Sequence, residues 1–131
     1  MKNLFYFNDI SEIVLPNDSY IVNIKKNLEE KKLLFNDYAE KLNFPAYFGK
    51  NWDAMIDCLS DLDEIKQKNI LIIHEDLPFT SNKKEIYNYF DILQTAIERW
   101  IDRDGHKLYV YFPRQYKDEI DHIISHPNFG D

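Results

Sequence analysis

Two short apolar runs, separated by one long amphipathic segment, constrain the fold of this chain more than any other feature. Residues 69–73, NILII, form a nearly continuous apolar run, as expected for a strand buried in a sheet. Residues 107–112, KLYVYF, favour a second strand. Between them, residues 83–102 repeat apolar side chains at helical spacing, which predicts an amphipathic helix. Strands that alternate with helices are typical of a parallel sheet covered by helices.

Further segments extend this order towards both ends of the chain. Residues 19–24, SYIVNI, are rich in β-branched and aromatic types and predict another strand. Apolar residues recur at helical spacing from 28 to 42, which predicts a helix that ends before Pro45, and Asn51 is a suitable N-cap for the next helix. A short helix is expected over residues 115–125. The predicted fold class is therefore α/β, with a small three-stranded parallel sheet packed with helices.

The chain is expected to form one domain over residues 1–131. Its length fits a single domain, and no internal repeat, low-complexity stretch or linker divides it. The core of this domain is placed at about residues 19–112. Short apolar runs at residues 3–7 and 11–15 predict an extra N-terminal strand or a hairpin before that core.

Composition indicates a cytoplasmic protein with a basic partner. The single cysteine, Cys58, cannot form a disulfide within the chain, so nothing indicates an oxidising compartment. The apolar run near the N-terminus is too short for a signal peptide, and no stretch is long enough to span a bilayer. Three glycines are too few for a Gly-rich phosphate cradle. The formal net charge of −7 suits a basic protein and disfavours nucleic acid.

The segment from residue 51 to residue 64, NWDAMIDCLSDLDE, concentrates negative charge. It holds no Lys or Arg, and its acids are Asp53, Asp57, Asp61, Asp63 and Glu64. Asp53, Asp57 and Asp61 are spaced by four residues, so we expect them to share one helix face. Like charges at that spacing destabilise a helix by roughly 0.2–0.5 kcal/mol per pair. A solvated acidic face is the ordinary interpretation, but the preceding aromatic pair, Tyr47-Phe48, favours a protein-binding surface.

Residues 43–60, NFPAYFGKNWDAMIDCLS, closely resemble the signature of the barstar family, the inhibitors of the ribonuclease barnase. The shared positions are Pro45, Tyr47, Gly49, Asn51, Asp53, Ala54, Asp57, Cys58 and Leu59. The match is specific because it combines a turn, a helix cap and a pair of acids at fixed spacing. The order of elements from about residue 19 to residue 112 is similar as well, whereas residues 1–18 and those after Pro113 have no clear counterpart.

The resemblance implies that the chain blocks the active site of a cationic ribonuclease and is not itself an enzyme. By that resemblance Asp57 takes the place of a substrate phosphate, Asp53 supports it, and Tyr47 packs on a catalytic histidine of the nuclease. We expect a 1:1 complex, a free monomer, and no cofactor, metal, nucleic acid or membrane. An antitoxin or immunity protein is the expected role. The expected partner-binding residues are Tyr47, Phe48, Gly49, Asn51, Asp53, Ile56, Asp57, Ser60 and Asp61.

The chain departs from the family pattern at several positions. Ile56 replaces the tryptophan before the key aspartate, while Asp61 and Leu62 replace a glycine and a tryptophan after the helix. The glutamate of the family's last helix falls on Trp100 in an ungapped alignment, with Glu98 nearby, which leaves that contact unassigned. These differences leave the mode of binding intact and favour a partner other than barnase, with a broader basic surface.

Functions from other classes remain open. One is a metal-dependent phosphodiester hydrolase with Asp53, Asp57 and Asp61 as ligands, although successive carboxylates on one helix seldom converge on one ion. Another is a barstar-like domain that binds a partner without nuclease activity. Cys58 as a nucleophile would need a nearby base, and neighbouring acids would raise its pKa. The candidate bases for Cys58 are His74 and His106. A separate and less favoured hypothesis is a metal site formed by Asp118, His122 and His126.

Overall fold

The predicted parallel sheet forms, with an additional strand at its edge. A computed structural model describes residues 1–45 and 48–126. Within these residues the strands are β1 (Leu4–Phe7), β2 (Ser19–Ile24), β3 (Asn69–His74) and β4 (Lys107–Pro113). They form one sheet in the order β1-β4-β3-β2, and each neighbouring pair is parallel. The predicted α/β class is confirmed.

The N-terminal addition is a strand and not a hairpin. β1 pairs with β4, with Leu4 in register with Val110. The second apolar run forms no strand within the described residues, because Ile10–Glu12 is a 3-10 turn, η1, whose N-cap Asp9 accepts a hydrogen bond from Ser11 N. Since β1 and β2 point the same way at opposite edges of the sheet, the chain between them has to cross the sheet instead of turning back.

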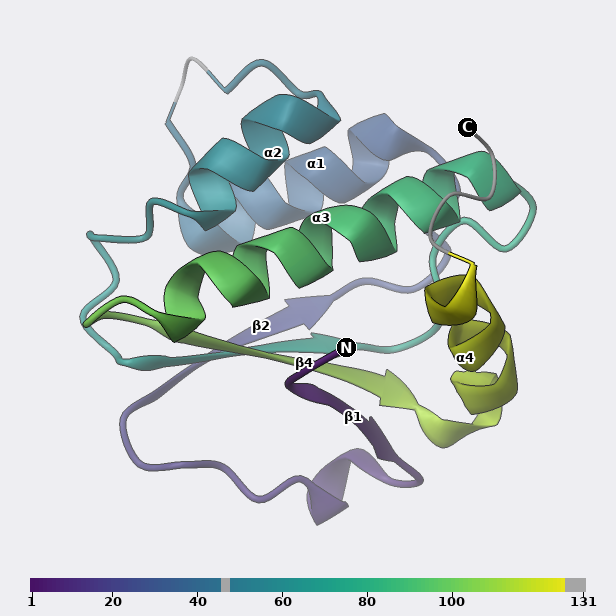
Figure 1. Ribbon diagram of the computed structural model, residues 1–131, viewed down its shortest axis with the longest axis horizontal. Helices are drawn as coiled ribbons and strands as arrows, with labels where there is room; N and C mark the ends of the chain where they lie inside the picture. The colour runs from purple at the N-terminus through teal and green to yellow at the C-terminus, as the bar shows by residue number, and fades with distance from the viewer. Residues whose placement is uncertain (46–47, 127–131) are drawn as a thin grey trace.

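Helices cover one face of the sheet (Figure 1). They are α1 (Lys31–Leu42), α2 (Trp52–Leu59) and α3 (Lys83–Ile101). The segment between β1 and β2 passes over the other face. The predicted C-terminal helix is present as α4 (Lys117–Ser125), which follows the short turn η2 (Arg114–Tyr116). None of the helices in the described ranges is long and apolar enough to cross a membrane.

The two-sided burial of β3 explains its continuous apolar run. Ile70 and Ile72 belong to the main core beneath the helices, whereas Leu71 and Ile73 pack with Phe7 on the other face. A partly buried side chain of the segment between β1 and β2 covers this second cluster. A strand that is covered on both faces needs apolar side chains at successive positions, as the sequence shows.

α3 is the main helix of the core and begins and ends close to its predicted bounds. Its N-cap, Asn82, accepts a hydrogen bond from Glu85 N at 3.3 Å. Its last turn carries Trp100, which is buried, and Ile101, which is partly exposed. The other apolar positions predicted for its inner face are all buried: Ile86, Tyr89, Phe90, Leu93 and Ile97.

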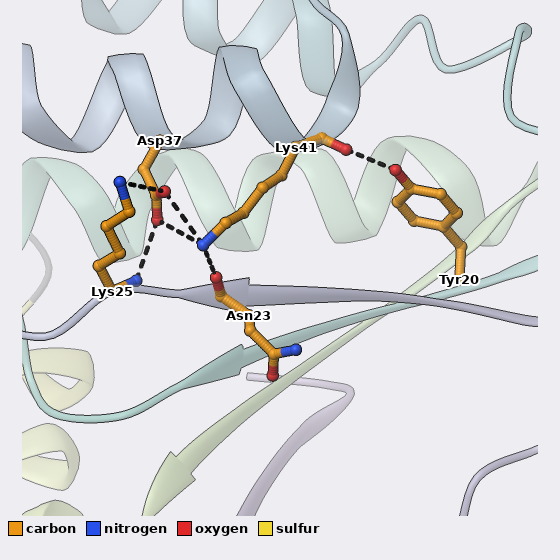
Figure 2. A network of polar contacts seen from close by, with 5 residues as sticks. All are labelled: Tyr20, Asn23, Lys25, Asp37 and Lys41. Atoms are coloured by element: carbon orange, nitrogen blue, oxygen red, sulfur yellow. Dashed lines mark hydrogen bonds and ion pairs between the residues drawn. The ribbon is translucent and has the colours of Figure 1, made fainter.

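A buried carboxylate fastens α1 to the end of β2 (Figure 2). Asp37 is only 2% exposed, and its Oδ2 accepts a hydrogen bond from the backbone N of Lys25 at 2.9 Å. Lys41 Nζ lies 3.0 Å from Asp37 Oδ1 and also donates to the carbonyl of Asn23. The hydroxyl of Tyr20 donates to Lys41 O at 2.5 Å. Because a buried charge is tolerated only when it is paired and hydrogen-bonded, this network fixes α1 against the sheet.

The second helix is shorter than predicted. α2 ends at Leu59, with Ser60 as its C-cap, so Asp61 lies outside the helix and the expectation that it shares a helix face with Asp53 and Asp57 is wrong. The carbonyls of Leu59 and Ser60 accept hydrogen bonds from the side chains of Trp100 and Arg103 and not from a further helical turn. Leu62 then points inward and is buried, which carries the chain away from the helix axis.

Candidate functional site

The predicted cap starts α2 and fixes its first turn. Asn51 has extended backbone angles, and its Oδ1 accepts a hydrogen bond from Ala54 N at 2.8 Å. The carbonyl of Asn51 also accepts the first helical bond, from Met55 N at 2.9 Å. Asp53 lies in this first turn, where the partial positive charge of the helix N-terminus stabilises a carboxylate. Asn51 therefore acts through the backbone of the helix that carries the acids.

One face of α2 is locked into the core. Met55 and Leu59 are fully buried. Trp52 packs edge-on against Phe35, with ring centroids 5.0 Å apart, and lies against Tyr89 of α3 at 6.1 Å. The opposite face is free of such contacts, and Asp53 and Asp57 are exposed there. The structure thus brings these two predicted acids together on a rigid support.

The end of α2 is held by the last turn of α3 and the residues that follow it. Trp100 Nε1 donates a hydrogen bond to Leu59 O at 2.7 Å, and Arg103 Nη1 donates to Ser60 O at 2.9 Å. Cations and donors at a helix C-terminus satisfy its free carbonyls and its partial negative charge. Trp100 is buried, so the position to which the family's last-helix glutamate aligns does not face a partner. Glu98 is exposed and accepts a hydrogen bond from Gln94 at 3.2 Å.

A cation that the sequence interpretation missed lies beside the main acid. Arg99 Nη1 is 4.0 Å from Asp57 Oδ1, and the side chains are 43% and 82% exposed, respectively. The same nitrogen donates to Ser60 Oγ at 3.1 Å. The period of α3 predicts that Arg99 borders the apolar face, since it adjoins the buried Trp100. The helical period of α3 does not reveal which other helix Arg99 contacts.

The acids around Cys58 disfavour thiolate chemistry. Burial, followed by the charges of Asp57 and Asp61, raises the pKa of the Cys58 thiol. Asp61 therefore lies close enough to act on Cys58, although it follows the helix. A raised pKa leaves little thiolate at neutral pH, which opposes a nucleophilic role.

The loop before α2 contributes buried and exposed residues. Phe48 is buried and packs edge-on against Phe35 and Phe44, with centroids 5.9 and 5.2 Å apart. Its side chain therefore anchors the loop. Gly49 is exposed and Ile56 is partly exposed, while the predicted contact residue Tyr47 lies outside the described residues.

The histidines proposed as bases are engaged elsewhere. His74 is fully buried, with Nδ1 3.0 Å from Tyr111 O and Nε2 2.6 Å from the hydroxyl of Tyr89. Burial lowers the pKa of His74 to about 3. His106 is also buried and places Nε2 2.6 Å from Ile65 O. These three contacts hold the imidazoles within the structure.

The residues considered as alternative metal ligands do not converge in the part of the chain that the structure describes. The rings of His122 and His126 lie 4.3 Å apart, and His126 Nδ1 is 2.8 Å from the carbonyl of His122. No group of three or more His, Cys, Asp or Glu side chains within residues 1–45 and 48–126 could hold a metal ion.

Comparison with known proteins shows the family of this chain. The family model described as Barstar (barnase inhibitor) matches residues 21–113, from β2 to the end of β4, and leaves β1 and α4 outside. A protein of Bacillus subtilis (strain 168) named "Putative ribonuclease inhibitor YrdF" is 43% identical over 35 residues. That stretch covers 27% of this chain and 38% of the length of YrdF. Because the family model matches most of its residues, the chain belongs to the barstar family of barnase inhibitors.

Proposed function

We propose that this protein inhibits a cationic ribonuclease by placing the exposed carboxylates of α2 in the cleft that binds substrate phosphate. The observation that carries the proposal is the position of Asp57. Its side chain is 82% exposed on a helix whose opposite face, through Met55 and Leu59, is fully buried. A nuclease cleft is lined with cations aimed at phosphate, and a fixed carboxylate fits the same donors.

Rigidity supports this proposal as much as charge does. α2 is capped by Asn51 at its start and held by Trp100 and Arg103 at its end. Binding to a preorganised helix needs little further ordering, so more of the interaction energy appears as affinity. The family description and the name of YrdF, which both refer to ribonuclease inhibition, point the same way.

Charge complementarity would also speed the encounter. The chain has a formal net charge of −7, and α2 carries the exposed acids Asp53 and Asp57, with the exposed Asp61 just after its end. Opposite fields on two proteins steer their association. In this proposal the free protein is a cytoplasmic monomer that forms a 1:1 complex and acts as an antitoxin or immunity protein.

The test is to capture nucleases on the purified protein, from the source cell and from genes encoded beside its own, and then to assay RNA cleavage. Wild-type protein should silence the captured ribonuclease, and Asp57→Ala should not. Asp118→Ala is the matched control, since Asp118 is an exposed acid on α4, far from α2 in Figure 1. If the captured partner cleaves no nucleic acid, the surface serves a different protein contact. If Asp118→Ala fails as badly as Asp57→Ala, net charge and not α2 is responsible.

A further inference from the structure

The acid that carries the proposed function has a cation of its own chain beside it. Arg99 Nη1 lies 4.0 Å from Asp57 Oδ1 and donates a hydrogen bond to Ser60 Oγ at 3.1 Å. The hydroxyl of Ser60 in turn donates to Ile56 O at 2.8 Å. The guanidinium is therefore tied to the same helical turn that carries Asp57.

A second guanidinium, that of Arg103, lies just after the C-terminal end of α3. Arg103 donates to Ser60 O at 2.9 Å and lies over the ring of Trp100, 4.7 Å from its centroid. Trp100 is itself fixed by its bond to Leu59 O. Both guanidinium groups are thus tied to Ser60, the C-cap of α2, and both arginines are exposed.

Any partner that reaches Asp57 also meets Arg99. The Arg99 side chain is 43% exposed, and a guanidinium carries five N–H donors, of which the bond to Ser60 uses one. A cleft that carries only cations is attracted by Asp57 and repelled by Arg99 over similar distances. A cleft that also carries a carboxylate next to its cations can pair with both, and a guanidinium binds a carboxylate through two parallel bonds.

We propose, on the basis of the proposed function, that Arg99 is a specificity-determining residue of this surface. It weakens the binding of clefts that present only cations, and it favours a ribonuclease that places a carboxylate beside its phosphate-binding cations. Selection of this kind depends on an unfavourable contact with the wrong partner as well as a favourable one with the right partner.

The first experiment uses amidated hexa-arginine, a probe that carries cations and no carboxylate, and follows the NMR amide signal of Asp57 during titration. Arg99→Gln should bind the peptide at least about fivefold more tightly than wild type, because a local repulsion is removed. Arg99→Lys keeps the charge and should bind like wild type. Arg114→Gln makes the same change in net charge on η2, beside α4, and should shift the affinity by less than about twofold.

The second experiment repeats the RNA-cleavage assay with the captured ribonuclease. Arg99→Gln should need a concentration about tenfold higher than wild type to inhibit it, equivalent to about 1.4 kcal/mol, because the pairing with the carboxylate of the cleft is lost. Arg114→Gln should inhibit it like wild type, and thermal unfolding of each variant checks that the fold is intact. The proposal is overturned if Arg99→Gln and Arg114→Gln behave alike towards the peptide, or if Arg99→Gln inhibits the captured ribonuclease as well as wild type does.

The outcomes separate this inference from the proposed function. A ribonuclease silenced through Asp57, together with no effect of Arg99→Gln, leaves the function standing and removes the specificity role. The opposite result is that Arg99→Gln binds hexa-arginine more tightly while no ribonuclease is silenced through Asp57. Arg99 then controls access to Asp57, but the proposed ribonuclease inhibition is wrong. The part of the inference that concerns a ribonuclease cleft is then wrong as well.

Discussion

Asp57 and Met55 lie two positions apart on α2 and show how one helical turn separates binding from folding. Met55 is fully buried and contributes to the core, while the Asp57 side chain is 82% exposed. Its one ion pair that the structure describes, with Arg99, has a length of 4.0 Å between partly exposed groups. Pairs of that kind contribute at most about 1 kcal/mol, so Asp57 is not needed for the fold.

Replacing Asp57 with alanine should therefore weaken ribonuclease binding by roughly 2–5 kcal/mol, because a desolvated charge pair in the complex is broken. The free energy of unfolding should change by no more than about 0.5 kcal/mol, as for other exposed positions. Calorimetric titration gives the first quantity and urea unfolding the second. A large loss of stability with unchanged affinity would show that Asp57 is a structural residue.

His74 makes the opposite kind of contribution, because it is buried and uncharged. A carbonyl can only accept, so Nδ1–H donates to Tyr111 O, and Nε2 accepts from the hydroxyl of Tyr89. The Tyr89 oxygen then accepts from Tyr38, at 2.5 Å between the hydroxyls. A proton on Nε2 would break this chain of bonds in a site without water access, which is why burial lowers the pKa.

The folded pKa of His74 is about 3, against an ordinary value of 6.5. Below pH 6.5 His74 binds a proton in the unfolded chain but not in the folded chain. Its contribution to the free energy of unfolding is therefore fully present above pH 6.5 and decreases as the pH falls towards 3. The slope from this group is about 1.4 kcal/mol per pH unit. Urea unfolding between pH 7 and pH 4 should show a shallower dependence for His74→Gln than for wild type by this amount. Equal slopes would mean that the imidazole is protonated in the folded state.

At the level of elements, the type and bounds of a helix or strand are predictable where they depend on the local apolar pattern. The bounds of α3 and the positions of β3 and β4 follow from apolar period and run length, and Asn51 marks the start of α2. The end of α2 depends on Trp100 and Arg103, about 40 positions further along the chain. No local pattern contains that information, and Asp61 was accordingly placed on the wrong element.

Long-range pairing limits the other predictions in the same way. A strand or a hairpin fits residues 3–7 and 11–15 equally well on local pattern alone. The choice is made by the pairing of β1 with β4, which joins Leu4 to Val110. The acids Asp53 and Asp57 were found because they share one helix, whereas Arg99 was missed because it approaches them from α3.

The contact between Trp100 and α2 leads to a prediction about that element. Trp100→Phe removes the donor to Leu59 O and leaves a buried carbonyl without this partner, at a cost of about 1–3 kcal/mol. Hydrogen exchange should accelerate at the last amides of α2, and ribonuclease binding should weaken because the helix is less well ordered. Urea unfolding and exchange monitored by NMR measure both effects.

Trp52→Phe is the matched control for that change. The Trp52 Nε1 atom is buried and makes no hydrogen bond within the described residues, so the same substitution removes no bond there. Its cost should be smaller than that of Trp100→Phe, since only packing is lost. Equal costs would show that the indole donor of Trp100 contributes nothing specific to the end of α2.

At the scale of the whole molecule, the matched family region and the additions have separate positions. The region over residues 21–113 contains α1, α2 and α3, and therefore every described residue of the candidate surface. β1 extends the sheet beyond β4, and α4 packs on α3 through Ile120 and Ile123 in the main core. The additions thus enlarge the domain at a distance from α2 (Figure 1), which leaves that helix accessible.

The net charge of −7 makes a prediction that belongs to the molecule as a whole. If opposite fields steer the encounter, the association rate with the ribonuclease should fall roughly tenfold or more between low and high salt, since charges beyond about 10 Å are screened at 0.1 M. The dissociation rate should change far less, because the pairs in the complex are desolvated and close. Stopped-flow mixing over a salt series measures both rates.

Asp118→Ala, which keeps α2 intact, should reduce the salt dependence of association only slightly, whereas Asp57→Ala should also raise the dissociation rate. An association rate that does not depend on salt would mean that shape and not charge brings the two proteins together, and the acids of α2 would then act only after contact.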